Sequence, residues 1–172
     1  MPELWDLYDS LRRPLGRTHP RGKALTYGTY HLVVFAWVLT DREELLLSRR
    51  HSDKSYGGFW ECTGGCVLAG EDTRAAAVRE LSEEVGVRLR PAQAVLARTV
   101  RRVDDFADTF IFRAALSPAS LCPQPGEVTE ARLVTLAEYD RMCADGLVVP
   151  SALGFRRLYG ALQAGTVLRE KL

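Results

Sequence analysis

The stretch GCVLAGEDTRAAAVRELSEEVGV, residues 65–87, decides how the rest of the chain is interpreted. It indicates a loop, then a helix, then a stop. Asp72 or Thr73 can cap the helix, alanines favour its first turns, and Gly86 supplies the left-handed residue that commonly ends a helix. We therefore expect a helix that runs to about residue 85. Its apolar positions at helical spacing, expected to lie on a sheet, are Ala75, Val78, Leu81 and Val85.

The opposite face of this predicted helix is acidic. Glu80, Glu83 and Glu84 stand at i, i+3 and i+4, so their carboxylates gather within one turn. Like charges at this spacing destabilise a helix by roughly a few tenths of a kcal/mol per pair, and a hard divalent cation would offset that repulsion. Carboxylate oxygens are the ligands that Mg²⁺ and Mn²⁺ prefer. We expect Arg79 to stay out of this patch and to reach back to a carboxylate such as Glu71 or Glu80.

An isolated acidic pattern of this kind more often marks only a solvated helix face. Here the whole spacing is more specific. This spacing resembles, position by position, the signature of the Nudix hydrolase family. It consists of Gly65, five residues, Glu71, seven residues, Arg79-Glu80-Leu81, one residue, Glu83-Glu84, one residue and Gly86-Val87. The resemblance implies an α/β/α sandwich with a mixed β-sheet. It also implies a hydrolase in which water attacks phosphorus and cleaves the diphosphate linkage of a nucleoside diphosphate derivative.

The resemblance assigns roles to individual residues. The implied ligands for Mg²⁺ or Mn²⁺ are Glu80, Glu83, Glu84, the backbone carbonyl of Gly65 and a glutamate of a later loop. For that later glutamate we prefer Glu127 to Glu130. Glu80 would bind metal or serve as the base, whereas Glu71 and Arg79 would orient the loop and the helix. The implied catalytic residues are Glu71, Arg79, Glu80 and Glu83.

Two β-rich runs precede residues 65–87, which we call the acidic segment, and two follow it. Residues 30–40 and 44–48 are separated by a polar turn, and we expect them to pair as a central hairpin. Residues 94–103 and 106–116 predict a second hairpin. The glycines at 64 and 65 are expected to adopt backbone conformations closed to other residues.

The two ends of the chain carry shorter elements. Residues 1–28 are punctuated by proline and glycine and indicate a small N-terminal hairpin extension. Toward the other end we expect a short strand at 132–134, a short helix at 136–143 and a terminal helix at 151–164. A chain of 172 residues suits one domain with a sizeable core, so we expect a single domain over residues 1–172.

A polar loop carries three cations that could meet an anionic substrate. Arg49, Arg50 and Lys54 precede the aromatic pair Phe59-Trp60. A solvated loop is the plainer interpretation, because charge runs usually face water. The alternative is that these three side chains bind the phosphates of a small-molecule diphosphate.

Composition limits the partners and the compartment. The formal net charge is +1, so no global field favours nucleic acid or a membrane surface. The longest apolar run, residues 32–39, is far shorter than the roughly twenty residues of a membrane span. Because no signal peptide is evident and the four cysteines form no C-x-x-C pair, we expect a cytoplasmic protein with reduced thiols. The oligomeric state stays open, and the N-terminal hairpin could contribute to a homodimer.

Segments outside the signature resemble the Nudix branch related to isopentenyl-diphosphate isomerase. These segments are residues 5–9, 16–19 and 30–32, Arg49-Arg50 with Lys54, and Phe59-Trp60. The isomerase uses a protonating cysteine and a metal bound largely by histidines around the glycine loop. Gly64 and Cys66 stand at those positions here, and only His31 matches a metal histidine. We therefore rank hydrolysis above isomerisation. A non-catalytic, nucleotide-sensing Nudix module is the third alternative, although no signature acid is missing.

Overall fold

The computed structural model describes residues 2–171, and a mixed β-sheet forms its centre. The strand order is β10-β7-β8-β3-β4-β5, with β6 paired to β3 and β9 paired to β4. The strands of this sheet are β3 (His31–Leu39), β4 (Glu44–Arg50), β5 (Trp60–Glu61), β6 (Thr63–Cys66), β7 (Val95–Arg101), β8 (Asp105–Arg113), β9 (Val128–Thr135) and β10 (Leu168–Lys171). The pairs β3–β8 and β10–β7 are parallel and the other pairs are antiparallel.

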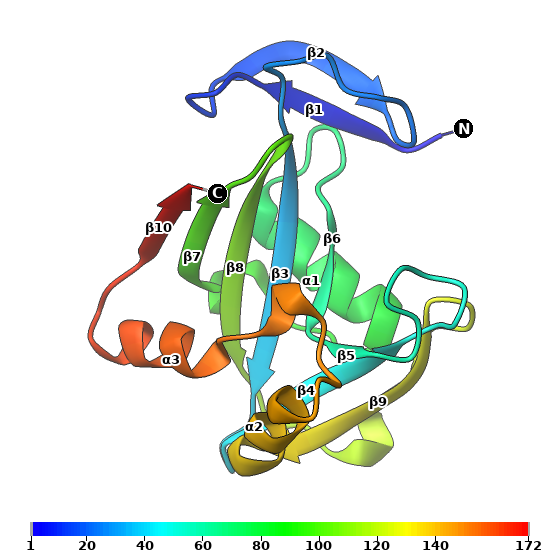
Figure 1. Cartoon of the computed structure of the whole chain (residues 1–172), viewed down its shortest axis with the longest axis vertical. Coiled ribbons are helices and arrows are strands. Elements are labelled where there is room, and N and C mark those ends of the chain that lie inside the picture. Colours follow the sequence, from blue (N-terminus) through cyan, green and yellow to red (C-terminus); the bar gives the residue numbers. More distant parts are fainter. Residues whose placement is uncertain (1, 172) are drawn as a thin grey trace.

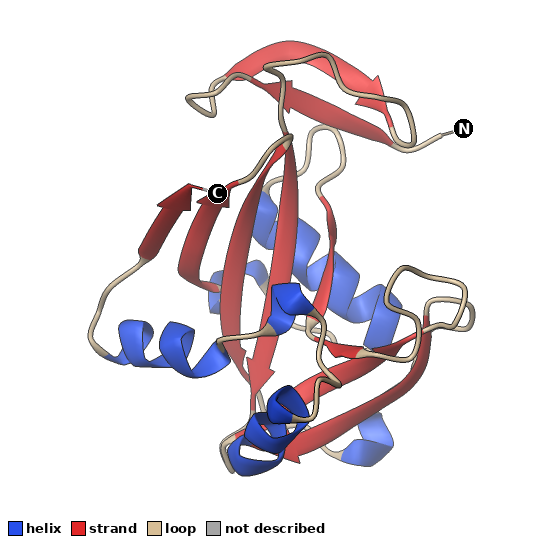
Figure 2. Ribbon diagram, in the orientation of Figure 1, coloured by secondary structure: helices blue, strands red, loops and turns tan. Residues whose placement is uncertain are grey.

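Three helices cover the two faces of this sheet (Figure 1 and Figure 2). They are α1 (Thr73–Val85), α2 (Leu136–Ala144) and α3 (Phe155–Gln163). Val34 and Val38 of β3 belong to the apolar cluster that includes α1, whereas Trp37 belongs to the cluster that includes α2 and α3. This alternation places one core on each side of β3, as the predicted α/β/α sandwich requires.

Helix α1 begins and ends where local signals predict. Asp72 Oδ1 accepts hydrogen bonds from the N–H groups of Arg74 and Ala75, and Gly86 takes the left-handed conformation with φ 74°. Its buried face differs from the predicted one. The buried residues are Ala76, Ala77, Leu81, Glu84 and Val85, while Ala75 and Val78 are only partly buried. Glu84 therefore shares the face that packs on the sheet, because Ala77, Leu81 and Glu84 lie on one side of the helix.

The predicted central hairpin of β3 and β4 forms only next to its turn. Strands β3 and β4 pair only through Leu39 and Leu45. Beyond that point β3 pairs with β8 on one side and β6 on the other, and β4 pairs with β9. The sequence could not reveal this divergence, because an apolar run that is buried on both faces accepts any neighbour.

The later elements follow the predictions with changes at their ends. Strands β7 and β8 form the second hairpin, and α2 begins at residue 136. Helix α3 begins later than expected, because residues 150–152 form a separate short 3₁₀ turn. Strand β9 extends well beyond residues 132–134, and β10 was not predicted. None of the helices within residues 2–171 combines the length and apolar character that crossing a membrane requires.

Strands β1 (Leu4–Tyr8) and β2 (Pro14–Pro20) form a separate antiparallel sheet across one end of the central sheet (Figure 1). Tyr8 bridges to Tyr30, and Trp5 stacks on the buried His31 ring with centroids 4.1 Å apart. Strand β1 also contacts the loop before α1, because the N–H of Ala69 donates to the carbonyl of Leu4 at 2.8 Å. The N-terminal hairpin, residues 2–21 as used below, therefore lies against the acidic segment.

Candidate active site

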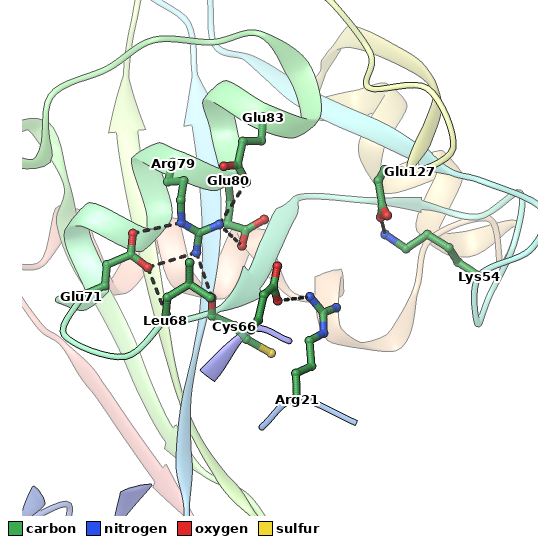
Figure 3. A network of polar contacts seen from close by, with 10 residues as sticks. Arg21, Lys54, Cys66, Leu68, Glu71, Arg79, Glu80, Glu83 and Glu127 are labelled. Carbon is green, nitrogen blue, oxygen red and sulfur yellow. Dashed lines mark hydrogen bonds and ion pairs between the residues drawn. The ribbon is translucent and has the colours of Figure 1, made fainter. Parts of the chain in front are cut away.

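A polar cavity of about 180 Å³ is lined by residues of α1, β6 and the N-terminal hairpin, among others. It is lined by Glu3, Arg21, Lys54, Gly64, Gly65, Cys66, Arg79, Glu80, Glu83, Glu84, Gln124 and Glu127. In Figure 3 the labelled side chains lie in three groups, which are Arg79 with its carboxylates, Arg21 beside Cys66, and Lys54 with Glu127. The cavity therefore collects residues from five separate segments: the N-terminal hairpin, the loop between β4 and β5, β6, α1 and the segment before β9.

Arg79 is the hub of the polar network in Figure 3. Its Nε and Nη2 donate to the two oxygens of Glu71 at 3.0 and 3.1 Å, so Glu71 is one of the two carboxylates that the sequence predicts for it. Nη2 also donates to the Cys66 carbonyl at 3.0 Å. Nη1 donates to Glu80 at 2.8 Å and to Glu83 at 3.0 Å. The expectation that Arg79 stays outside the acidic patch is wrong, because Glu83 lies one turn further along the same helix.

Glu71 fixes the loop that enters α1. Its Oε2 accepts the N–H of Leu68 at 3.1 Å as well as the Arg79 guanidinium. On the same loop the N–H of Gly70 donates to Asp6 Oδ2 at 2.7 Å. Glu71, Arg79 and β1 together therefore hold the loop against the first turns of the helix.

Gly64 and Gly65 are needed for space and not for a special backbone conformation. Neither has a positive φ, contrary to expectation, and both pair with β3. A Cβ atom on Gly65 would lie 2.2 Å from Glu80 Oε1, and one on Gly64 would lie 2.8 Å from the Val34 carbonyl oxygen. The absence of a side chain at 65 thus allows the Glu80 carboxylate to lie against the β6 backbone.

Glu84 is a buried carboxylate with one unpaired oxygen. It is 6% exposed, and no described residue forms a hydrogen bond to its Oε2. Burial, followed by the neighbouring carboxylates of Glu80 and Glu61, raises the pKa of Glu84 to about 8. Burial also raises the pKa of Glu80, against the lowering effect of Arg79. A buried carboxylate oxygen without a partner is costly unless a cation or a donor compensates it.

The donor set fits a hard divalent cation. Within residues 2–171 no three His, Cys, Asp or Glu side chains converge closely enough to hold a metal ion as they stand, and Arg79 engages both Glu80 and Glu83. Glu84, whose buried Oε2 has no hydrogen-bond partner among the described residues, nevertheless lines the same cavity as Glu80, Glu83 and Gly65. Carboxylate and carbonyl oxygens of this kind suit Mg²⁺ or Mn²⁺.

Of the two glutamates considered for the late loop, only Glu127 lies at the cavity. It forms an ion pair with Lys54, whose hydrogen bond lowers the pKa of the Glu127 carboxyl. Glu130 is exposed and lies within β9, opposite Arg49. The structure therefore keeps Glu127 as the candidate ligand.

Two of the three predicted substrate-binding cations lie elsewhere. Arg50 Nη1 contacts both Glu61 oxygens at 2.6 Å, and its Nε donates to the Ser55 carbonyl at 2.6 Å. Arg49 Nε donates to the Gly58 carbonyl at 2.9 Å. Neither side chain lines the cavity, because both shape the loop between β4 and β5. Lys54 alone of the three reaches the site.

Four residues at or beside the site are not predictable from the sequence. Arg21 and Glu3 reach the cavity from the N-terminal hairpin, Gln124 donates its N–H to the Glu84 carbonyl at 2.8 Å, and Glu61 raises the pKa of Glu84. No local pattern marks them, since they belong to separate elements that only the folded chain brings together. His31, which matched an isomerase ligand, stacks on Trp5 and does not line the cavity.

A family model described as the NUDIX domain matches residues 29–150. An uncharacterized Nudix hydrolase of Listeria monocytogenes is 30% identical over 150 residues, which cover 86% of this chain and 89% of that protein.

Two solved structures share the fold. A crystal structure of a Deinococcus radiodurans protein has a TM-score of 0.68 at 22% identity and covers 91% of this chain and 99% of its own. The NUDIX domain of Shewanella oneidensis NrtR, solved with ADP ribose, has a TM-score of 0.63 at 18% identity and covers 86% of this chain and 94% of its own. At these identities the likeness shows the fold alone.

Proposed function

The chain belongs to the Nudix hydrolase family, whose members act on a diphosphate linkage, and we propose that it is a Mg²⁺- or Mn²⁺-dependent pyrophosphohydrolase acting on a nucleoside diphosphate derivative. One observation carries the proposal. The signature carboxylates Glu80, Glu83 and Glu84 line a single cavity, and the buried Glu84 oxygen has no partner among the described residues. The nucleotide part of the proposal draws on the related Shewanella domain that was solved with ADP ribose.

The residues that would hold the metal are Glu80, Glu83, Glu84, Glu127 and the Gly65 carbonyl. When bound, a divalent cation would neutralise diphosphate charge and lower the pKa of a water molecule. The chain's own contribution is positioning: Arg79 fixes Glu80 and Glu83 relative to Glu71. The raised pKa of Glu80, caused first by burial, suits a carboxylate that accepts a proton. Lys54 at the cavity wall can meet a phosphate oxygen.

The test is a hydrolysis screen with Mg²⁺ or Mn²⁺. The purified chain is incubated with nucleoside triphosphates, dinucleotides and nucleotide sugars, and released phosphate, pyrophosphate or nucleoside monophosphate is measured. Turnover of at least one of these diphosphates is expected. Absence of turnover across the panel with either metal would refute the proposal. Glu127→Gln should lower the rate, and Glu130→Gln, at an exposed position outside the cavity, serves as the matched control.

An isomerase-like activity has weaker support. Cys66 lines the cavity, and burial raises the pKa of its thiol to about 11, but no histidine lines the cavity among the described residues. The relatives reported above give the isomerase branch no support. Proton exchange from D₂O into isopentenyl diphosphate, followed by NMR, separates the two activities. A nucleotide-sensing module without catalysis would instead bind a nucleotide tightly and show no metal-dependent turnover.

A further inference from the structure

We propose that the N-terminal hairpin contributes to substrate binding through Arg21. Arg21 binds the substrate's diphosphate by exchanging its present partner, Glu3, for a phosphate oxygen. The inference rests on the proposed function for the class of ligand. The family model matches residues 29–150, so the hairpin lies outside the matched part of the chain. Glu3 and Arg21 nevertheless line the same cavity as the signature acids.

The hairpin is fixed firmly enough to place a side chain. Arg12 forms a bidentate ion pair with Asp108 of β8, at 2.8 and 2.6 Å, and Asp108 is 3% exposed. At the other end Gly70 and Ala69, in the loop before α1, donate to Asp6 and to the Leu4 carbonyl. The position of the hairpin relative to α1 is thus set by buried or backbone contacts at both of its ends.

Arg21 has fewer protein partners than Arg79, and its one partner is an exposed carboxylate. The Arg79 guanidinium is shared among Glu71, Glu80, Glu83 and the Cys66 carbonyl, and Lys54 is paired with Glu127. Arg21 donates through Nη1 to Glu3 at 2.6 Å, and its side chain forms no other hydrogen bond or ion pair among the described residues. In Figure 3 the Arg21 side chain lies beside Cys66, on the side of the cavity away from α1. Its remaining donors suit the fork-like recognition of a phosphate.

The Arg21–Glu3 pair is easily exchanged. The two side chains are 59% and 49% exposed, and ion pairs between exposed side chains are weak because water and salt screen them. A diphosphate is a stronger acceptor for a guanidinium than a single exposed carboxylate. Glu3 therefore competes with the substrate for Arg21 and adds negative charge at the mouth of the cavity. Removing each partner should change affinity in opposite directions.

The experiment measures binding and turnover separately. Binding of imidodiphosphate, a diphosphate analogue with a P–N–P bridge, is measured by calorimetry in Mg²⁺, and KM and kcat are measured with a substrate found in the screen. Arg21→Gln should raise Kd and KM by about tenfold, the loss of one hydrogen bond to a charged group. Glu3→Gln should lower both by about threefold. For both variants kcat should stay within about threefold, and Arg21→Lys should recover part of the affinity.

Matched controls separate binding from folding. Arg17→Gln removes an exposed arginine of β2 that does not line the cavity, and it should leave Kd unchanged. If Arg21→Gln and Glu3→Gln weaken binding in the same direction, the pair is only structural and the proposal is overturned. Unchanged affinity in Arg21→Gln overturns it as well. Absent turnover in the wild-type chain would refute the proposed function alone, because imidodiphosphate binding still tests Arg21.

Discussion

Replacing Gly65 by alanine should disable the site without unfolding the protein. The added Cβ would lie 2.2 Å from Glu80 Oε1, 2.3 Å from its Cδ and 2.7 Å from Oε2, whereas ordinary contact begins near 3.4 Å. The Glu80 carboxylate must therefore retreat by about 1 Å. A misplacement of that size costs on the order of a hundredfold in rate, or about 2.7 kcal/mol in the activation free energy. We expect kcat to fall by about that factor.

Stability should respond differently, because the clash involves the end of a flexible side chain. The free energy of unfolding of Gly65→Ala should change by less than about 1 kcal/mol. In Gly64→Ala the Cβ would instead meet the Val34 carbonyl oxygen at 2.8 Å, and a backbone atom cannot move aside. We expect that variant to lose about 1–3 kcal/mol. Urea denaturation followed by tryptophan fluorescence measures both values, and metal-dependent hydrolysis measures the rates.

Gly160→Ala is the matched control for the added methyl group. Gly160 lies within α3, and a Cβ there would meet nothing within 4 Å. This variant should keep the wild-type kcat and gain about 0.5–1 kcal/mol, because alanine favours a helix more than glycine does. If folded Gly65→Ala hydrolyses substrate within threefold of the wild-type rate, the position of the Glu80 carboxylate does not govern catalysis and the reasoning fails.

Three further predictions concern single side chains. Glu83→Gln should lower kcat at least about a hundredfold with an unchanged melting temperature, because its side chain is 51% exposed; a near-normal rate would show that it is no key ligand. Arg12→Ala should cost about 3 kcal/mol in urea denaturation by leaving the buried Asp108 carboxylate with the Thr99 hydroxyl but without its cation, and much less in an Asp108→Asn background; equal losses would contradict this. Burial lowers the pKa of His31, so the unfolded chain binds the proton first as pH falls below about 6.5. The free energy of unfolding should therefore drop from about pH 7 to pH 5, and His31→Gln should reduce that slope; an unchanged slope would contradict the assignment.

The acidic segment could be predicted well because its signals are local. The Asp72 cap, the Gly86 stop and the spacing of Glu80 from Glu83 all act within a few residues. Each depends on hydrogen bonds or periodicity that the chain sets before any long-range contact forms. Helix α2 and the second hairpin were predictable for the same reason.

Predictions that depended on distant neighbours fared less well. The predicted pairing of β3 with β4 is confined to Leu39 and Leu45, and β8 and β6 take the rest of the two edges of β3. For Arg49 and Arg50 the sequence leaves open a solvated loop or a substrate contact, and in the structure both side chains donate to carbonyls of their own loop. A charged side chain gives no sign in the sequence of which partner it will find, because that partner is decided by the summed free energy of the fold.

The sequence by itself thus determined the chemistry: the spacing from Gly65 to Val87 specifies a loop and a helix that present carboxylates together. The tertiary structure decided the environment of those carboxylates. It buries the Glu84 carboxylate with Oε2 unpaired among the described residues, and it brings Arg21 to the cavity from the N-terminal hairpin, which is far from α1 in the chain. The physical reason is the distance along the chain over which each interaction acts. Caps and helical periods act over a few residues, whereas burial and ion pairing depend on segments that meet only when the whole sheet has formed.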